Sequence, residues 1–282
     1  MITLLFALLA LSPVEGLAQD LEVDVTDPAA HKIVLLAGGF SKGGGEHEYF
    51  AGSVVLFNLL KQTAGVQPVL AKEWPKNEKI FEGAKTIVFF MDGIGKQPTA
   101  QPEKMAKIEA LAAKGVGIVH LHQVIDYPKD SGERALPLLG GVWVPKMGTR
   151  GHWVDSFETF PEHPVTRGVT PFKIDDGYIY KNRFVESGVT PLLRVKPPKG
   201  PALKGMEDVV AWTYDRPAGG RTFVFTGCHL HVSWGLEGMR RFVVNGILWS
   251  AGLEIPAGGA PVALDPADLK KNLDVKPAAA PK

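Results

Sequence analysis

Four short apolar runs, separated by helix-periodic segments, restrict the chain to an α/β architecture. The runs are Lys32–Ala37, Lys85–Met91, Gly115–Leu121 and Thr222–Thr226. Each has the length of one strand, and a continuous apolar run is typical of a strand that is buried on both faces. Strands that alternate with helices predict parallel βαβ units. We therefore expect one largely parallel central sheet with helices on both faces.

The segments that flank these runs supply the helices and two further strands. The residues after the first run read EHEYFAGSVVLFNLLKQ and place their apolar side chains on one helix face. Pro102–Lys114 and Leu236–Leu253 have the same periodicity, and Val66–Leu70 is a short strand. Asp208–Tyr214 should pair with Thr222–Thr226 as a hairpin, because the intervening RPAGG has the composition of a turn.

The middle of the chain, Asp126–Lys204, is less regular and rich in Pro and Gly. Short strand-like pieces occur at His152–Phe157, Tyr178–Phe184 and Pro191–Val195. We interpret this segment as an insertion or an antiparallel extension that covers the tips of the sheet.

The first residues, MITLLFALLALSPVEGLAQD, predict a signal peptide. An apolar run ends before Pro13, and Gly16 and Ala18 suit cleavage after Ala18, although no Lys or Arg precedes the run. The alternative is a disordered or membrane-tethered tail. With export we expect a periplasmic or extracellular protein that is not stably inserted in a membrane. The expected division is a signal peptide at 1–18, a linker at 19–31, one domain at 32–256 and a mobile Pro/Ala-rich tail at 257–282.

The charge balance and the cysteine count exclude several classes of function. The formal net charge is +1, from 31 basic and 30 acidic residues, so it does not indicate a nucleic-acid partner. Cys228 is the only cysteine, which excludes an intramolecular disulfide and a Cys-rich metal site. We interpret Cys228 as a small packing residue, because no nucleophile elbow surrounds it and an exported thiol would be open to oxidation.

Histidines follow three of the predicted strands. His47 comes after the first apolar run through a Gly-rich loop, His122 follows the third run, and His229 follows the fourth. The carboxyl ends of parallel strands lie on one edge of a sheet, so we expect these side chains to surround one pocket. His231 should face the same pocket, since residues i and i+2 of an extended segment point the same way.

Two kinds of chemistry suit such a cluster. Neutral imidazoles are common zinc ligands, and His47, His122 and His229 would leave a fourth position open for water. Without a metal, the same groups can act as a general acid and base. His47 is expected in the first turn of its helix, where the helix dipole favours a neutral ring and the adjacent Glu46 and Glu48 favour a charged one.

A second polar motif, KIDDGYIYK, contains Asp175, Asp176 and Tyr178. Asp176 and Tyr178 would share one face of an extended segment, whereas a polar turn at Asp-Asp-Gly is the local alternative. Trp234 could stack on a sugar ring, although core packing is the default for a tryptophan.

Several motifs along residues 32–256 give the chain a family resemblance. They are GEHEY around His47, GVGIVHLH ending at His122, HPVTRG at His163, DDGY at Asp175–Tyr178, GGRTFVFTGCHLHVSW through His229, and FVVNGILWSAG in the last helix. Together they resemble the ThuA-like (trehalose utilisation) family, whose fold is similar to the flavodoxin-like fold of class I glutamine amidotransferases. The resemblance implies an α/β fold with a mostly parallel central sheet, helices on both faces and an antiparallel extension.

The resemblance also implies a function. It indicates an enzyme that acts on a small carbohydrate, a sugar or an oxidised sugar, by histidine-based acid/base or metal-assisted chemistry. Hydrolysis, elimination and isomerisation all fit. His122 looks like the counterpart of the amidotransferase nucleophilic cysteine, so glutaminase activity is not expected. The alternative is a non-catalytic carbohydrate-binding or scaffold protein on the same fold, and either could form a homo-oligomer.

The site residues that we expect come from these motifs. At Asp176 and Gly177 the chain departs from the family, whose members usually have a glutamate followed by an aromatic residue. The expected roles are catalysis for His122, His229 and Asp176, substrate contact for Glu46, Tyr178, His231 and Trp234, and metal ligation, zinc first, for His47, His122 and His229.

Overall fold

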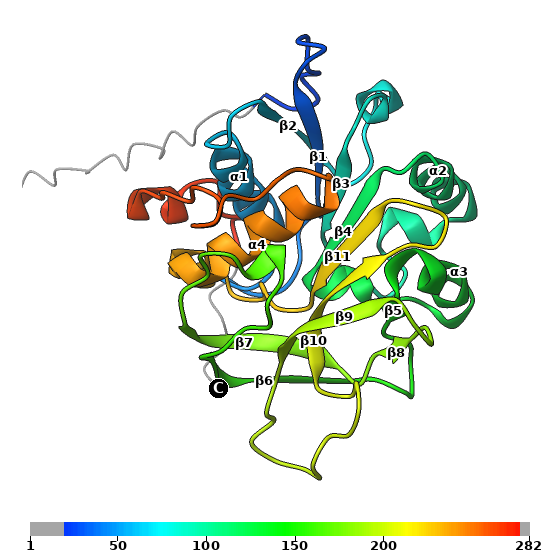
Figure 1. Cartoon of the computed structure of the whole chain (residues 1–282), viewed down its shortest axis with the longest axis vertical. Coiled ribbons are helices and arrows are strands. Elements are labelled where there is room, and N and C mark those ends of the chain that lie inside the picture. Colours follow the sequence, from blue (N-terminus) through cyan, green and yellow to red (C-terminus); the bar gives the residue numbers. More distant parts are fainter. Residues whose placement is uncertain (1–19, 277–282) are drawn as a thin grey trace, which may run out of the picture.

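A seven-stranded sheet lies at the centre of the structure, a computed structural model that describes residues 20–276 (Figure 1). Its strand order is β2-β1-β3-β4-β11-β10-β9. The strands are β1 (His31–Ala37), β2 (Val66–Lys72), β3 (Thr86–Phe90), β4 (Gly117–Leu121), β9 (Val189–Arg194), β10 (Val209–Asp215) and β11 (Arg221–Phe225).

The sheet is parallel over most of its width. Strands β2, β1, β3, β4 and β11 run in one direction, and β10 pairs antiparallel with both β11 and β9. The antiparallel pair β10–β11 is the hairpin that the turn sequence RPAGG predicts. The predicted fold class, a mostly parallel sheet with an antiparallel extension, is confirmed.

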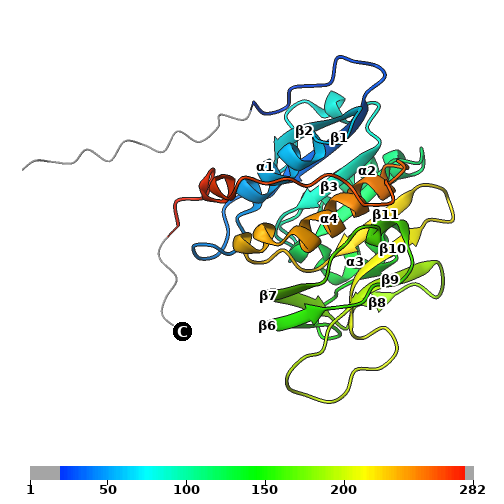
Figure 2. The ribbon, with the colours of Figure 1, turned by 60° about the vertical axis from the view of Figure 1, so that its left-hand side comes forward.

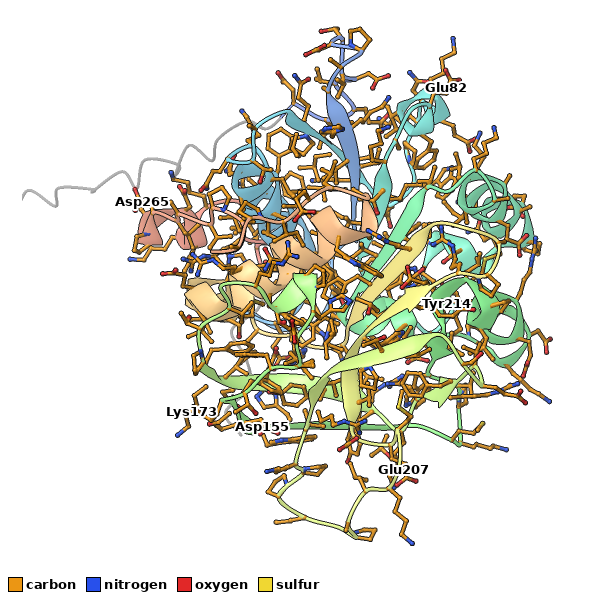
Figure 3. The ribbon with its side chains drawn as sticks, in the orientation of Figure 1. Glu82, Asp155, Lys173, Glu207, Tyr214 and Asp265 are labelled. Carbon is orange, nitrogen blue, oxygen red and sulfur yellow. The ribbon has the colours of Figure 1, made fainter. Side chains whose placement is uncertain are left out.

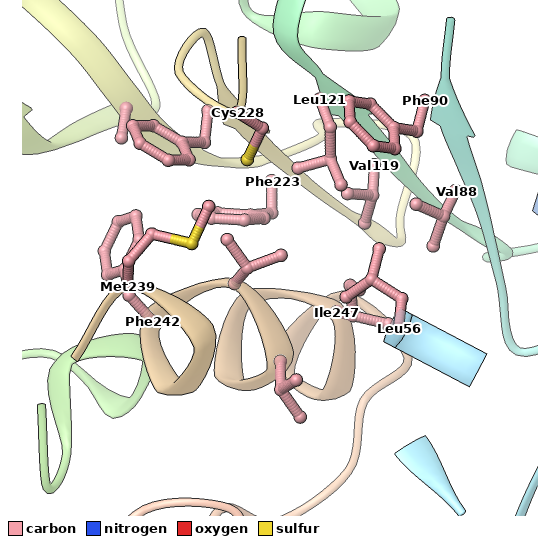
Figure 4. Close-up of a cluster of buried hydrophobic side chains, with 14 of the residues drawn as sticks. Leu56, Val88, Phe90, Val119, Leu121, Phe223, Cys228, Met239, Phe242 and Ile247 are labelled. Carbon is pink, nitrogen blue, oxygen red and sulfur yellow. The ribbon is translucent and has the colours of Figure 1, made fainter. Parts of the chain in front are cut away.

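Helices cover both faces of the sheet (Figures 1 and 2). Two of them, α1 (Tyr49–Leu60) and α4 (Glu237–Ser250), pack on one face, where Leu56 and Ile247 meet Val88 (Figure 4). The other two, α2 (Pro102–Ala112) and α3 (Lys129–Leu139), pack on the opposite face. The alternation of side chains along β3 explains the division, because Val88 faces the first pair of helices and Ile87 the second.

Helix α3 is an element that the sequence pattern did not predict. It lies in the Pro- and Gly-rich middle segment, starts after Pro128 and contains Pro137 in its last turn. Its buried residues Ala135, Leu136 and Leu139 nevertheless form an apolar face against the sheet. Tertiary packing here outweighs the low helix propensity of the segment.

The rest of the middle segment covers the carboxyl ends of the parallel strands. Strands β6 (Thr149–Phe157) and β7 (Phe172–Tyr180) form a two-stranded antiparallel sheet, which lies below the central sheet in Figure 1. A smaller pair, β5 (Gly141–Val142) and β8 (Arg183–Phe184), lies beside it. Short 3₁₀ helices are η1 (Glu78–Phe81), η2 (Pro98–Ala100), η3 (His122–Ile125), η4 (Pro164–Thr166), η5 (His231–Gly235) and η6 (Pro266–Lys270).

The two ends of the described chain pack against the domain. The predicted signal peptide lies outside the described residues. After α4 the chain runs back across α1 and α4. The described part of the predicted mobile tail, residues 257–276, packs along these two helices. Gln62, just after α1, makes hydrogen bonds of 2.7 and 2.9 Å to the backbone of Ala263, and Asn245 of α4 accepts from the N–H of Ala260 at 2.9 Å. Between residues 20 and 276, no helix has the length and apolar character needed to cross a membrane.

Most charged side chains lie on the outside of this arrangement. Figure 3 shows Glu82 and Lys173 projecting from the periphery, whereas Tyr214 of β10 is buried in the core. The close packing inside is clearest at Gly246 of α4, where a β-carbon would lie 2.3 Å from the ring of Phe223. Glycine therefore allows α4 to approach β11.

We predict that Gly246→Ala destabilises the protein. Helix propensity alone would favour alanine by about 1 kcal/mol, but overpacking against Phe223 costs about 1–3 kcal/mol. Urea denaturation would give the difference in the free energy of unfolding. Ala106→Gly on the exposed face of α2 is the control for propensity and should lose about 1 kcal/mol. A Gly246→Ala protein more stable than wild type would contradict the packing.

Candidate functional site

Three histidines from separate loops meet at the carboxyl edge of the parallel sheet. His47 lies between β1 and α1, His122 directly follows β4, and His229 follows β11. The Nε2 atoms of His47 and His122 are 3.1 Å apart, and Nδ1 of His229 lies 3.3 Å from Nε2 of His122. One nitrogen from each ring lies within 4.8 Å of the other two, so the three histidines form a candidate metal site.

The backbone at this edge is held in the left-handed region. The φ angle is +51° at His47 and +61° at His122, and it is +71° at Cys228, beside His229. Such a conformation costs a non-glycine residue about 1–3 kcal/mol and persists where surrounding contacts fix it. One such contact is a hydrogen bond of 3.0 Å from the His47 N–H to the His229 carbonyl. His47 therefore precedes α1 and does not lie in its first turn, where the sequence placed it.

Asp92, just after β3, anchors the imidazole of His47. Its Oδ1 lies 3.0 Å from Nδ1 of His47 and 2.7 Å from the Tyr49 hydroxyl. Its Oδ2 accepts from the Ser41 hydroxyl at 2.6 Å and from Lys96 at 3.0 Å. Burial by itself would raise the pKa of Asp92, but these hydrogen bonds, with that from His47 first, outweigh it and hold the pKa well below its ordinary value. Asp92 is therefore a carboxylate.

The same hydrogen bonds fix which nitrogen of His47 carries the hydrogen. The hydroxyl groups of Ser41 and Tyr49 both donate to Asp92. The three oxygen atoms that lie 2.8 to 3.2 Å from Nδ1 of His47 are therefore left as acceptors. Nδ1 carries a hydrogen, so in the neutral ring it is Nε2 that presents a lone pair to the site.

A backbone carbonyl likewise determines which nitrogen of His122 carries the hydrogen. Its Nδ1 lies 3.1 Å from the carbonyl oxygen of Thr226, which can only accept, so Nδ1 carries the hydrogen and Nε2 the lone pair. Burial, and then the neighbouring His47 and His229, lower the pKa of His122 well below its ordinary value. When both rings are neutral, two lone pairs face each other across 3.1 Å, an arrangement that a cation bound by both nitrogen atoms would stabilise.

His229 completes the cluster because Gly177 leaves room for its ring. A β-carbon on Gly177 would lie 2.9 Å from Cγ of His229. The carboxylate of Glu46 lies 3.7 Å from Nε2 of His229. That carboxylate favours a hydrogen on Nε2, so that Nδ1, which faces His122, is the ligand atom.

The loop that carries His229 is held by the carboxylate of Asp176, which is fully buried. Its oxygen atoms accept from the backbone N–H groups of Gly177, Cys228, His229 and Leu230 at 2.8 to 3.1 Å. Burial raises the pKa of Asp176 to about 7, against the lowering effect of these four donors. The structure therefore places Asp176, expected to be catalytic, beneath the loop and outside the cavity lining.

A cavity of about 260 Å³ opens beside the three histidines. Arg150 and His152 of β6 line it, together with Lys42 of the Gly-rich loop. Nε2 of His152 lies 3.0 Å from the carboxylate of Asp175, and its ring centre lies 5.4 Å from that of His229. The site thus combines a cluster of nitrogen ligands with a polar cavity in which a small molecule can reach them.

Comparison with known proteins identifies the family. The model of the family described as trehalose utilisation (ThuA) matches residues 39–250. The chain belongs to the ThuA family. No curated protein is similar enough to the chain to count as a relative.

Solved ThuA-like structures share the fold. The chain is similar to a ThuA-like protein from Parabacteroides merdae ATCC 43184, with a TM-score of 0.56 and 16% identity over 86% of this chain and 99% of that one. A ThuA-like protein from Bacteroides uniformis ATCC 8492 has a TM-score of 0.56 and 14% identity over 80% of this chain and 93% of that one. PurLQS from Thermotoga maritima matches at a TM-score of only 0.46, with 17% identity over 79% of this chain and 97% of that one.

Two other residues expected in the site, His231 and Trp234, lie outside the cavity lining, and a third, Tyr178, only borders the cavity. His231 begins η5, so the chain is not extended there, and its buried ring does not line the cavity. Trp234 is fully buried, with its ring centre 6.0 Å from that of Phe90. Tyr178 borders the cavity, but its ring packs in the core, 4.9 Å from Trp153.

Cys228 packs in the core, as expected of a small packing residue. Its sulfur lies among Phe223, Met239 and Phe242 (Figure 4). Burial, and then the charge of Asp176, raise the pKa of the Cys228 thiol well above its ordinary value, so the thiol stays protonated.

Sequence reasoning missed two residues on which the histidine geometry depends. Asp92 follows a buried strand in the same way as His122 does, and this signal could have found it. The sequence marked Gly177 only as a departure from the family. Its role could not be predicted, because Gly177 and His229 lie close together in space but far apart in the sequence.

We predict that His122 of the metal-free protein is neutral at neutral pH, with its hydrogen on Nδ1. Its pKa is lowered well below the ordinary value, so the ring protonates only at a lower pH than an ordinary histidine, and the Thr226 carbonyl holds the Nδ1 hydrogen. Long-range ¹H–¹⁵N spectra report both the charge and the tautomer. His120, buried in the core with a pKa lowered to about 3, is the control for a neutral ring. An Nε2–H tautomer, or titration near pH 6.5, would contradict this geometry.

Proposed function

We propose that the protein is an enzyme that acts on a small carbohydrate with the help of a divalent metal held by His47, His122 and His229. The observation that supports this most directly is the approach of two Nε2 atoms to 3.1 Å, on two rings whose Nδ1 atoms are each bound to an acceptor and whose lone pairs repel when both are neutral. Protonation would relieve their repulsion, but burial disfavours a charged His122 ring. A metal ion satisfies both nitrogen atoms without adding a proton.

Zinc is the metal that fits the donor set best. Three neutral imidazoles suit zinc, and catalytic zinc sites commonly have three protein ligands and one open position. The Nδ1 hydrogens of His47 and His122 are bound by a carboxylate and a backbone carbonyl, the usual supports for metal-binding histidines. Bound there, zinc would lower the pKa of a water molecule to about 7 and so supply a nucleophile.

Other residues position the histidines or are placed to exchange a proton with the substrate. Asp92 keeps the hydrogen of His47 on Nδ1, and Asp176 holds the backbone of the loop that carries His229. His152, oriented by Asp175, lines the cavity and is placed to exchange a proton with a bound molecule. These roles suit hydrolysis, elimination or isomerisation of a sugar.

Carbohydrate as the substrate class is supported by the family description, trehalose utilisation. Glutaminase chemistry is disfavoured because Cys228 is a buried thiol and His122 follows β4 at the site. The alternative of a non-catalytic sugar-binding protein is also disfavoured. Such a protein would be expected to offer aromatic rings to the sugar, but the Tyr178 ring packs in the core and the cavity lining is otherwise histidine, cationic and amide groups with small or aliphatic residues.

We predict that the untagged protein, purified without chelators, contains close to one zinc per chain. His122→Ala should lose the metal, because it removes the ligand between the other two rings. Elemental analysis and far-UV circular dichroism would be measured together. His31→Ala, at the opposite end of β1, is the matched control and should keep both metal and fold. Wild-type protein without metal, or a folded His122→Ala protein that keeps it, would refute the proposal.

Export belongs to the same proposal and follows from the predicted signal peptide at 1–18. Protein recovered from the envelope fraction of its native host should begin at Gln19, because Gly16 and Ala18 suit a signal peptidase. N-terminal sequencing would show this directly. An intact Met1 on protein from the cytoplasmic fraction would argue against export.

A further inference from the structure

We infer that the cavity beside the three histidines binds the carboxylate of a sugar acid, such as a uronate or an aldonate, through Lys42 and Arg150. The inference rests on the proposed function, because it narrows the carbohydrate substrate of the same site. It depends on the size of the cavity and on the charges that line it.

The size of the cavity limits the ligand. Its volume of about 260 Å³ is below the roughly 300–1,000 Å³ of typical ligand pockets. That space suits one sugar ring better than two. The ring would lie against His152 and Gln123, whose polar groups can bind hydroxyl groups, and His229 lines the same cavity.

Arg150 is a positioned cation in the cavity wall. Its guanidinium pairs with the buried carboxylate of Asp126 and lies 4.4 Å from the centre of the Trp143 ring. A guanidinium has five N–H donors in a fixed plane, and the bond to Asp126 leaves others for a second carboxylate. Held on one side by an ion pair and on another by stacking, Arg150 needs little rearrangement to bind an anion.

Lys42 supplies the charge that is not balanced within the protein. It lines the cavity from the Gly-rich loop, at a φ angle of +57°, and no carboxylate of residues 20–276 lies within ion-pair distance of its ammonium group. The nearby carboxylates have other partners. Asp92 binds Lys96, Asp126 binds Arg150, Asp175 binds His152, and Glu46 lies beside His229.

The charge balance favours a monoanion. Among the residues that line the cavity, the Arg150 charge is compensated by Asp126, whereas the charge of Lys42 has no ion-pair partner among the described residues. The charge of a single carboxylate, −1, matches that of Lys42, whereas a phosphate monoester carries a charge of about −1.5 to −2. The shared chemistry is an anionic sugar, and the carboxylate form is the one that this balance selects.

The test is calorimetric titration of the full chain with sodium D-glucuronate, D-glucose and D-glucose 6-phosphate. Each titration is done with metal-free and with zinc-loaded protein, because a carboxylate can also bind zinc directly. We expect glucuronate to bind about tenfold more tightly than glucose in both forms, as a charge-assisted hydrogen bond provides, and at least as tightly as glucose 6-phosphate.

Lys42→Gln should remove most of the preference for glucuronate over glucose without changing the zinc content. Arg150→Lys, which keeps a charge beside Asp126, should weaken the preference because the planar donor fork is lost. Lys114→Gln, at the other end of the sheet, is the matched control and should leave the preference unchanged.

Three results would overturn the inference. They are equal or undetectable binding of glucuronate and glucose, a preference that survives Lys42→Gln, and tighter binding of glucose 6-phosphate than of glucuronate. The outcomes also separate the two proposals. A protein that binds zinc but does not prefer glucuronate would refute the sugar-acid site alone. A protein that prefers glucuronate but binds no zinc would refute the metal site and support the anion site.

Discussion

The opposed lone pairs of His47 and His122 are the interaction on which the account of this protein depends. Each ring is oriented by a hydrogen bond from Nδ1. The Asp92 carboxylate binds Nδ1 of His47, and the Thr226 carbonyl binds Nδ1 of His122. Both partners accept, so both rings must present Nε2 inward, although the two atoms repel when nothing lies between them. Two nitrogen acceptors fixed 3.1 Å apart in a buried position, with His229 beside them, form a candidate site for a cation.

The fold makes that arrangement possible at a modest energetic cost. Parallel strands bring their carboxyl ends to one edge, and the turns that leave β1, β4 and β11 hold His47, His122 and Cys228 at positive φ. The strain is supported by contacts between these loops, including the four backbone hydrogen bonds to Asp176. The β6–β7 sheet then lies over the same edge and converts an open surface into a cavity with cationic groups in its wall.

Sequence patterns predicted the sheet well and the site in part. The continuous apolar runs of β1, β3, β4 and β11 could be found because burial on both faces leaves no polar alternation. Helix α3 could not be predicted in this way. Pro137 and the surrounding glycines lower its helix propensity, and its apolar face forms a helix only because it packs against the sheet. The three histidines could be grouped by their position after strands, but the loss of His231 from the group depends on where η5 begins. The contact of Gly177 with His229 is a long-range one, which no local pattern encodes.

X-ray absorption spectroscopy at the zinc edge of the purified protein tests the central claim most directly. The account predicts three imidazole nitrogen atoms at about 2.0–2.1 Å and one further light ligand at a similar distance. A first shell with a sulfur ligand at about 2.3 Å, or with oxygen atoms and fewer than three imidazoles, would contradict it.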